Sequence, residues 1–482
     1  MLRERITMRK TKIICTVGPA TDDDNVMREM MLSGMNVARF NFSHGDYETH
    51  KMRYDQVVRL REELGLPIAT MLDTKGPEIR LGNFTDHKKV TLTAGQTFTL
   101  TTEDVDGTSE RASITYKGLP GDLAPGRSVL IDDGAIELKV EKITAAEIVC
   151  KVIVGGVVSD HKGINVPGTD ISMPYVSEKD MSDLEFGAKT GYDFIAASFV
   201  RSSADVNYLR KCLKSLGWNT PRVIAKIENP DGVNNIDEII EAADGIMVAR
   251  GDMGVEIPFE QIPAIQKEII EKVYLSGKYV ITATQMLESM ITNARPTRAE
   301  ITDVANAIYD GTSAIMLSGE TAAGHYPSEA VKTMAKIAET TENHIEYVRR
   351  FRERPHNTNT KTNTTDAVSH AAVTLAHDLG TKAIVTVTKS GSTARNLSKF
   401  RPDSIIIGCT PSETALRQMS ISWGVYPVMM EEKASTDELL ESGLEAAKGT
   451  GILQKGDLAV ITAGIPLGII GNTNMLKVAT VE

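Results

Sequence analysis

The chain has few of the features that mark secreted, zinc-binding or nucleic-acid-binding proteins. Its 482 residues include only four cysteines and no CxxC pair, so neither a disulfide framework nor a structural zinc site is expected. Aromatic residues make up 5% of the sequence and the formal net charge is −11, which disfavours nucleic acid and anionic membranes, because both attract cationic surfaces. No apolar run reaches membrane-spanning length and no signal-peptide core follows the basic first residues. We therefore expect a cytoplasmic protein with no membrane or nucleic-acid partner.

Three well-known catalytic motifs are also missing. The sequence contains no GxxxxGK[ST] phosphate loop, no HExxH zinc motif and no GxSxG nucleophile elbow. Any nucleotide must therefore be bound by some means other than a P-loop.

What the sequence does contain is an alternation of short apolar runs with longer amphipathic segments. The runs are apolar on both faces, as is typical of buried parallel strands, and occupy residues 12–16, 37–41, 68–72, 194–199, 223–226, 245–248, 279–283 and 314–317. Amphipathic stretches that predict helices lie between or after them, at 48–64, 261–277, 297–311 and 326–345. Eight strands alternating with helices predict an α/β fold, a (β/α)8 TIM barrel.

The interval between the third and fourth runs is far longer than one helix requires. Within it, residues 77–176 alternate in hydropathy between Gly and Pro turns, which predicts a small antiparallel β-barrel inserted at the rim, where it could act as a lid. The catalytic barrel then comprises residues 1–76 and 177–350. A Thr- and Asn-rich linker at 349–366 leads into a C-terminal α/β regulatory domain, residues 351–482, with strands expected at 382–388, 404–410 and 457–464.

The carboxyl ends of the eight runs carry many polar and charged residues. Such residues are costly beside buried strands unless they pair, bind a metal or meet a ligand, and in a barrel these ends converge on one rim. They are Arg39, Asn41 and Ser43 after the second run; Asp73, Thr74, Lys75, Glu78 and Arg80 after the third; Lys226 and Glu228 after the fifth; Arg250 and Asp252 after the sixth; Thr282 and Thr284 after the seventh; and Ser318 and Glu320 after the eighth. Because they come from so many strands, a functional site is favoured over a ring of structural ion pairs.

Two of these residues indicate a divalent cation. Glu228 and Asp252 follow neighbouring strands, and two carboxylates with water and substrate oxygens suit Mg²⁺ or Mn²⁺. The alternative is that they form salt bridges to Lys226 and Arg250. Lys226, together with Arg39, could instead neutralise a phosphoryl group, which predicts a metal-dependent phosphoryl-transfer enzyme.

A second group suggests a monovalent cation. Asn41, Ser43, Asp73 and Thr74 offer several oxygens and one formal charge. Asn and Ser also serve as ordinary turn residues, so this pattern is weak when taken alone.

Several long motifs match the pyruvate kinase family in content and order. They are KTKIICTVGPAT, MNVARFNFSHG, LDTKGPEIR, HKGINVPG, IAKIENPDGV, MVARGDMGVEIP, TATQMLESM, RPTRAEITDVANAIYDGTSAIMLSGETAAGHYP and TKSGSTAR. Because they extend along nearly the whole chain, the sequence closely resembles the bacterial type without an extra C-terminal domain. The resemblance implies allosterically regulated transfer of phosphate from phosphoenolpyruvate to ADP, followed by protonation of the enolate.

The resemblance also implies roles for the rim residues. The substrate-binding set is Arg39, Lys226, Ala249, Arg250, Gly251, Asp252 and Thr284, of which Arg39, Lys226 and Thr284 are catalytic; Glu228 and Asp252 would hold the divalent ion, and Asn41, Ser43, Asp73 and Thr74 would hold K⁺. Glu78 matches the residue type of potassium-dependent members. Arg80 and Lys162 match positions that contact the nucleotide, and Lys162 lies on the expected lid.

Residues 386–395 form a small-residue loop between an expected strand and helix. Exposed amides, hydroxyls and a lysine there suit a phosphate, although a plain βα turn is the alternative. In the family this loop resembles the effector site, which implies that a phosphorylated metabolite contacts Thr388, Lys389, Ser390, Ser392 and Thr393. The family also implies a homotetramer. Residues 1–7 precede its usual start.

Two other functions are compatible with parts of this pattern. A metal-dependent lyase or aldolase of the phosphoenolpyruvate/pyruvate barrel type would use the same cation and arginine, but it has no need of a nucleotide contact such as Lys162. A catalytically silent metabolite-binding protein is disfavoured because every position expected to do chemistry carries a competent residue.

Overall fold

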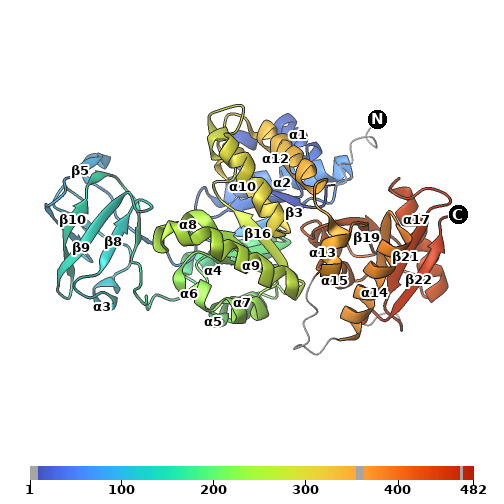
Figure 1. Ribbon diagram of the computed structural model, residues 1–482. Coiled ribbons are helices and arrows are strands. Elements are labelled where there is room, and N and C mark those ends of the chain that lie inside the picture. The colour runs from blue at the N-terminus through green and yellow to red at the C-terminus, as the bar shows by residue number, and fades with distance from the viewer. Residues whose placement is uncertain (1–8, 354–362, 467–470) are drawn as a thin grey trace.

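Eight parallel strands close into a barrel at the centre of the molecule (Figure 1). The structure, a computed structural model, describes residues 9–353, 363–466 and 471–482. Around the barrel the strands follow the order β1-β17-β16-β15-β14-β13-β3-β2. Their bounds are β1 (Lys12–Thr16), β2 (Val37–Asn41), β3 (Ala69–Asp73), β13 (Phe194–Ala197), β14 (Arg222–Ile227), β15 (Gly245–Ala249), β16 (Tyr279–Ala283) and β17 (Ala314–Leu317). The predicted (β/α)8 barrel is confirmed.

Helices cover the outside of the barrel, and their ends follow from local sequence. The side chain of Asp46 accepts the amide of Thr49 at the start of one helix, which ends at Gly65 with a φ of 62°. The helices are α1 (Asp24–Leu32), α2 (Tyr47–Leu64), α4 (Glu178–Thr190), α5 (Ser203–Ser215), α6 (Pro230–Asn234), α7 (Ile236–Ala242), α8 (Arg250–Glu256), α9 (Ile262–Ser276), α10 (Arg298–Asp310), α11 (Gly319–Ala322) and α12 (Pro327–Glu342). Three short 3-10 turns belong to the described barrel residues, η2 (Pro19–Thr21), η4 (Phe259–Gln261) and η5 (Glu288–Ile291), and η3 (Thr85–His87) lies in the β domain.

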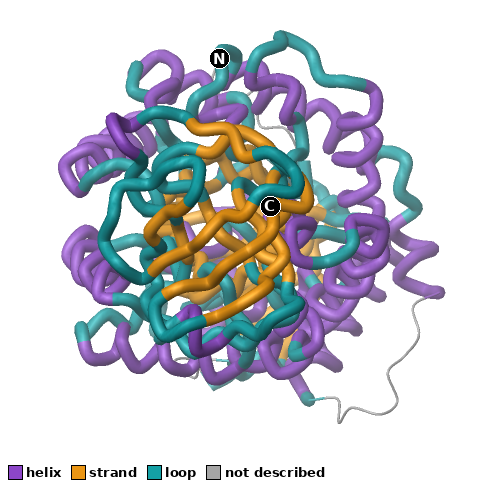
Figure 2. The backbone as a smooth tube through the Cα atoms, turned by 90° about the vertical axis from the view of Figure 1, so that its left-hand side faces the viewer, coloured by secondary structure: helices purple, strands orange, loops and turns teal. Residues whose placement is uncertain are grey.

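The segment between β3 and α4 forms a separate β domain, seen in front of the barrel helices in Figure 2. Its elements are β4 (Ile79–Arg80), β5 (Val90–Leu92), β6 (Thr97–Thr101), β7 (Arg111–Ser113), α3 (Leu119–Asp122), β8 (Ser128–Ile131), β9 (Ile136–Ile143), β10 (Glu147–Val154), β11 (Gly156–Val158) and β12 (Gly163–Asn165). Seven strands pair in the order β4-β12-β8-β9-β10-β6-β7, and an isolated bridge between Leu81 and Ile114 joins the two edges. The expectation of a purely antiparallel domain is wrong, because β6 and β7 are parallel.

The C-terminal part is a five-stranded sheet with helices on its faces, in the order β20-β19-β18-β21-β22. Its elements are α13 (Tyr347–Glu353), α14 (Thr364–Leu379), β18 (Ala383–Val387), α15 (Ser392–Ser398), β19 (Ile405–Thr410), α16 (Glu413–Met419), β20 (Val425–Met429), α17 (Thr436–Gly449), β21 (Leu458–Ala463) and β22 (Met475–Thr480). Two edge strands, β20 and β22, were not predicted. The expected linker at 349–366 is wrong for 349–353, which end α13, and for 364–366, which begin α14. Residues 354–362 lie outside the described residues, as do residues 1–7.

The β domain and the C-terminal sheet lie on opposite sides of the barrel (Figure 1). The β domain follows β3 and therefore lies at the carboxyl end of the strands. At the other end, Arg395 of α15 donates to the hydroxyl of Tyr279 over 3.3 Å, and Arg417 of α16 pairs with Asp193 at 2.8 Å. Among the described residues, no helix has the length and apolar character needed to cross a membrane.

Candidate active site

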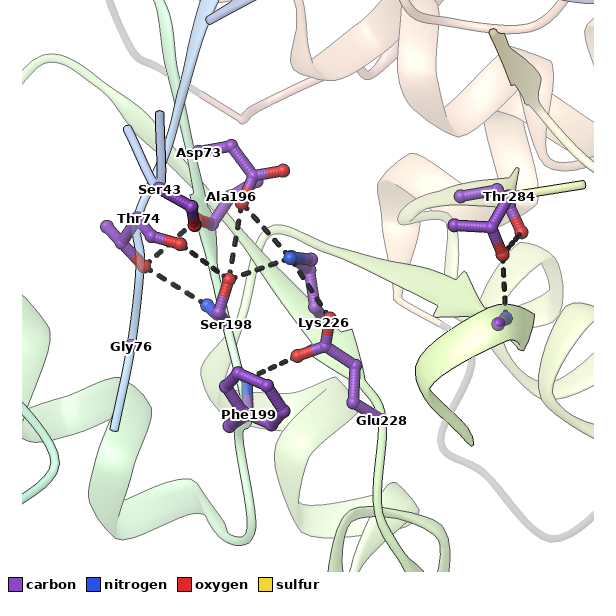
Figure 3. Close-up of polar contacts among 12 residues, drawn as sticks. Ser43, Asp73, Thr74, Gly76, Ala196, Ser198, Phe199, Lys226, Glu228 and Thr284 are labelled. Carbon is purple, nitrogen blue, oxygen red and sulfur yellow. Dashed lines mark hydrogen bonds and ion pairs between the residues drawn. The ribbon is translucent and has the colours of Figure 1, made fainter. Parts of the chain in front are cut away.

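Lys226 lies at the centre of a buried polar cluster at the carboxyl end of β14 (Figure 3). Its Nζ is 3.1 Å from Oδ1 of Asp73, 3.0 Å from Oε1 of Glu228 and 2.7 Å from the hydroxyl of Ser198. An ammonium group has three protons to donate, so each proton has one partner. Burial lowers the pKa of Lys226, but Asp73 and Glu228 outweigh burial and hold its pKa above the usual value. The side chain is therefore a fixed, permanent positive charge.

Arg39 reaches the same carboxylate from the neighbouring strand. Its Nε lies 2.5 Å from Oδ2 of Asp73, and its Nη1 donates to the hydroxyl of Thr16 over 2.9 Å. Burial raises the pKa of Asp73, but Arg39 and Lys226 lower it by more, so this fully buried carboxyl is ionised. One anion thus orients two cations, and the guanidinium and ammonium groups are brought together from β2 and β14.

Glu228 and Asp252 supply the negative charge beside Lys226. Glu228 is 1% exposed, and its Oε2 accepts the amide of Phe199 over 2.5 Å. Burial raises the pKa of Glu228 to about 8, and the nearby charge of Asp252 contributes to that increase. A bound cation would relieve this cost, which makes the pair suitable for a divalent metal. Of the two salt bridges considered as an alternative, Lys226–Glu228 forms, whereas Arg250 pairs with Asp303 at 2.7 Å.

No larger metal-binding group accompanies these two carboxylates. Among the described residues, no set of three or more His, Cys, Asp or Glu side chains is arranged to hold a metal ion. A divalent ion at Glu228 and Asp252 would therefore take its remaining ligands from water or from a bound anion, as Mg²⁺ commonly does.

The four residues expected to bind a monovalent cation come from the ends of β2 and β3. Asn41 and Asp73 are paired in register, and the amide of Phe42 donates to the carbonyl of Asp73 over 3.0 Å. Ser43 is drawn with Asp73 and Thr74 in Figure 3. The side-chain oxygen of Asn41 accepts the amide of Ser43 over 3.2 Å. The structure thus gathers these oxygen donors beside Lys226 and Arg39.

Thr284 lies beyond the end of β16, next to the first turn of α8. Its hydroxyl accepts the amide of Gly251 over 2.8 Å, and its φ of 70° is unusual for a β-branched residue. Arg250 donates to the carbonyl of Thr284 over 2.7 Å. These contacts tie the end of β15, at Ala249, and the first turn of α8, which carries Asp252, to the loop that follows β16.

Not every residue expected at the rim faces this cluster. The hydroxyl of Thr282 donates to Thr312 within the barrel wall over 3.0 Å. Glu320 is fully buried, where it accepts the amides of Leu287 and Ser318 at 3.0 and 2.7 Å and so shapes two loops. The rim prediction was wrong for these two side chains, because local backbone and hydroxyl partners satisfy them.

The β domain faces the cluster through its β8–β9 turn. Asn165 donates to Glu256 of α8 over 3.1 Å, and burial together with the charge of Asp252 raises the pKa of Asp133. Lys162 pairs with Asp132 at 2.8 Å. Arg80 pairs with Glu78 at 2.7 Å. The two expected nucleotide contacts therefore lie on the β domain, each held by one acid.

Ser198 is the site residue that sequence reasoning missed. The fourth apolar run was taken as 194–199, but β13 ends at Ala197, so Ser198 occupies the carboxyl end of its strand. It is 1% exposed and contacts Lys226, Asp73 and Thr74. The sequence did contain a clue. Of the second to eighth apolar runs, only this fourth run was given no rim residue, although it contains the hydroxyl of Ser198.

The loop between β18 and α15 lines a pocket in the C-terminal sheet. All five expected effector residues line it: Thr388, Lys389, Ser390, Ser392 and Thr393. Lys389 pairs with Glu432, which also lines the pocket, at 2.6 Å, and Lys433 of the same lining pairs with Glu431 at 2.7 Å. The pocket therefore has a mixed polar and apolar lining, and each of its two lysines is paired with an acid.

Comparisons with known proteins agree along the whole chain. The family described as pyruvate kinase, barrel domain, matches residues 8–331, and that described as pyruvate kinase, alpha/beta domain, matches residues 366–479. A pyruvate kinase of Clostridium acetobutylicum is 50% identical over 476 residues, which cover 98% of this chain and 100% of that protein. One from Staphylococcus saprophyticus is 49% identical over 475 residues, 98% of this chain and 80% of that protein. A crystal structure of a pyruvate kinase from Cryptosporidium parvum has a TM-score of 0.92 and 39% identity, covering 99% of this chain and 97% of that one.

Proposed function

The chain belongs to the pyruvate kinase family, and on this premise we propose which of its residues carry out each part of the reaction. The enzyme is a phosphotransferase of glycolysis that converts phosphoenolpyruvate and ADP to pyruvate and ATP. The observation that carries the assignment is the contact of Lys226 with both Asp73 and Glu228. This contact gathers cationic and anionic groups from two strands, β3 and β14, at one rim.

Lys226 and Arg39 bind the phosphoryl group and neutralise charge that moves between oxygens during transfer. Both are buried and both are oriented by Asp73, so little reorganisation is needed when the substrate arrives. Preorganised cations of this kind stabilise the transition state more than the ground state.

Glu228 and Asp252 are the proposed ligands of Mg²⁺ or Mn²⁺. Their fit rests on the raised pKa of Glu228, because two neighbouring carboxylates in a buried site favour a bound cation. When bound, the ion supplies Lewis-acid charge to the substrate oxygens. The amides and side chains around Ala249, Arg250 and Gly251 orient the substrate carboxylate, and Thr284 lies beside the carbon that is protonated.

Asn41, Ser43, Asp73 and Thr74 are the proposed K⁺ ligands. Their fit rests on donor chemistry, since hydroxyl, amide, carbonyl and carboxylate oxygens suit a hard cation of low charge. Glu78 is assigned to potassium dependence through the residue type that it shares with potassium-dependent relatives.

Residues 77–176 act as the proposed lid over a barrel formed by residues 1–76 and 177–350. Lys162 and Arg80 bring two positive charges to the phosphates of ADP or ATP, and closure would exclude water from the site. The proposed regulatory domain, residues 351–482, binds a phosphorylated metabolite at Thr388, Lys389, Ser390, Ser392 and Thr393. A homotetramer and a cytoplasmic location complete the proposal.

A metal-dependent lyase is disfavoured by the matches to both families and by the two lid cations. The direct test is pyruvate formation from phosphoenolpyruvate in the presence of Mg²⁺ and K⁺, with and without ADP. Pyruvate formed only when ADP is present supports the phosphotransferase. Pyruvate formed without ADP would indicate hydrolysis by a phosphatase, and no turnover of phosphoenolpyruvate would indicate a lyase that acts on another substrate or a binding protein.

A further inference from the structure

Ser198 occupies the position at which the proposed K⁺ ligands meet the proposed catalytic lysine. It follows β13 directly and lies between β3 and β14 in the order of barrel strands. Its side chain is 1% exposed, so water does not compete for its hydroxyl. Figure 3 shows it with Thr74 on one side and Lys226 on the other.

The backbone carbonyl of Ser198 accepts the hydroxyl of Tyr175 over 3.0 Å, and four further contacts join Ser198 to the polar cluster. Lys226 donates to its hydroxyl over 2.7 Å, and the hydroxyl lies 2.6 Å from the carbonyl oxygen of Thr74 and 3.2 Å from Oδ1 of Asp73. Its own amide donates to the hydroxyl of Thr74 over 3.2 Å. Ser198 therefore contacts Thr74 through both its backbone and its side chain.

The hydrogen-bonding capacity of a hydroxyl determines what each contact does. A serine hydroxyl has one proton and two lone pairs, whereas an ammonium group can only donate. Lys226 therefore occupies a lone pair of Ser198, and the single proton of Ser198 is directed to the Thr74 carbonyl or to Asp73. The shorter distance favours the carbonyl.

Both the Lys226 ammonium and the Thr74 carbonyl depend on the hydroxyl of Ser198 for a hydrogen bond. The three protons of the Lys226 ammonium have three partners in Asp73, Glu228 and Ser198, so removing the hydroxyl leaves one proton without its partner. On the other side, the Thr74 carbonyl loses the donor that fixes its direction. One substitution therefore loosens both the lysine and the oxygen group.

We propose that Ser198 is a positioning residue whose single hydroxyl orients the Lys226 ammonium and the Thr74 carbonyl together, and so couples K⁺ binding to the phosphoryl-binding lysine. This inference rests on the K⁺ assignment under the proposed function. It predicts that a change at Ser198 alters the response to K⁺, which a purely structural serine would leave unchanged.

The test compares the full-length wild type with Ser198→Ala. The first measurement is the rise in Tm as K⁺ replaces tetramethylammonium at constant ionic strength without substrates, because a ligand that binds the native state raises Tm. We expect the half-maximal K⁺ concentration to be at least about fivefold higher in Ser198→Ala, the loss expected for about one hydrogen bond. In the second measurement, kcat should fall about 100-fold, because small displacements of a catalytic group have costs of this size.

Two further variants control the experiment. Ser182→Ala removes a hydroxyl from the exposed face of α4, where it donates to Glu178, and should respond to K⁺ like the wild type. If Ser198→Ala does not fold, Ser198→Cys carries the same test, because a thiol donates and accepts only weakly.

The possible results distinguish the role of Ser198 from the assignment of the K⁺ ligands. A K⁺ midpoint within twofold of the wild type, or a lower one, in a folded Ser198 variant overturns the role of Ser198 and leaves the K⁺ assignment intact. A wild type whose Tm and activity do not respond to K⁺ overturns both. A raised midpoint together with reduced kcat supports the coupling.

Discussion

The ammonium of Lys226 lies 3.0 Å from the carboxylate of Glu228, two residues further along the same chain. In an extended strand, residues two apart project from the same face, so both side chains point toward the barrel rim. Removing the positive member leaves Glu228 and Asp252 without their cation.

Lys226→Met should reduce kcat at least about 100-fold, the usual cost of removing a preorganised group that stabilises transition-state charge. The coupled rate of pyruvate formation measures the effect, and circular dichroism checks the fold. Lys272→Met on α9 is a matched control, because that lysine pairs with Asp237 at the surface. A rate within threefold of the wild type would remove Lys226 from the mechanism.

Replacing K⁺ by tetramethylammonium should reduce activity at least about tenfold, since a bulky organic ion cannot be coordinated by closely spaced oxygens. Glu78→Lys should lessen that dependence by supplying a positive charge of its own. Initial rates at constant ionic strength measure both effects. Equal rates of the wild type in the two salts would contradict a potassium role.

Lys162→Met should raise the KM for ADP about tenfold while changing the KM for phosphoenolpyruvate by less than twofold. The reason is that Lys162 lies on the β domain and provides a charge-assisted contact worth about 1.4 kcal/mol or more. Lys151→Met, on the exposed face of β10, is the control. Equal increases in both KM values would argue against a contact with the nucleotide.

Lys389→Glu should blunt activation by phosphorylated metabolites and leave unactivated catalysis unchanged. The substitution places a second carboxylate opposite Glu432 in the pocket, so a phosphate would meet repulsion from two sides. A screen of sugar phosphates and nucleotides at sub-saturating phosphoenolpyruvate identifies the activator to be used. Lys448→Glu, at the end of α17, is the control. Unchanged activation would assign the effector to another site.

His50 should make the thermal stability of the protein depend on pH, through its contacts with Phe42 and His44. Its Nε2 donates to the carbonyl of His44, its ring stacks on Phe42 at 4.1 Å, and its buried Nδ1 has no partner among the described residues. Burial lowers the pKa of His50 below 6.5, so the neutral ring is favoured in the folded state. Its stability contribution is complete above pH 6.5 and is lost as the pH falls toward the folded pKa, by at most about 1.4 kcal/mol per pH unit.

His50→Gln retains an amide donor but does not titrate. Between pH 6.5 and 5, the Tm of this variant should fall less steeply than that of the wild type. Parallel Tm curves would show that the pKa of His50 is the same in the folded and unfolded states and would contradict the prediction.

The sequence predicts the barrel well because buried parallel strands are apolar on both faces, and all eight runs overlap the observed strands. It predicts β20 poorly because VYPVM contains Pro427, which is tolerated here only because β20 is an edge strand. Whether a strand lies at an edge is a property of the assembled sheet. The parallel pairing of β6 with β7 was missed because β7 is also an edge strand, and its partner is decided only when the sheet assembles.

At the site, residue type and strand position predict the gathering of Arg39, Lys226, Asp73 and Glu228. They do not predict the direction in which each side chain points. Thr282 and Thr284 are two residues apart, yet one bonds within the barrel wall and the other, at a φ of 70°, turns toward Gly251. Ser198 is a further example, because its importance comes from partners on β3 and β14 that only the closed barrel brings together.

The β domain and the C-terminal sheet lie on opposite sides of the barrel, so the polar cluster at the rim and the contacts with the C-terminal sheet are separated by the length of a strand. Tyr279 begins β16 beside Arg395, and Thr284 follows its other end, so the two contacts are about 16 Å apart at about 3.3 Å per residue. Under the proposed function, residues of the effector pocket can therefore change without disturbing the groups that handle phosphate.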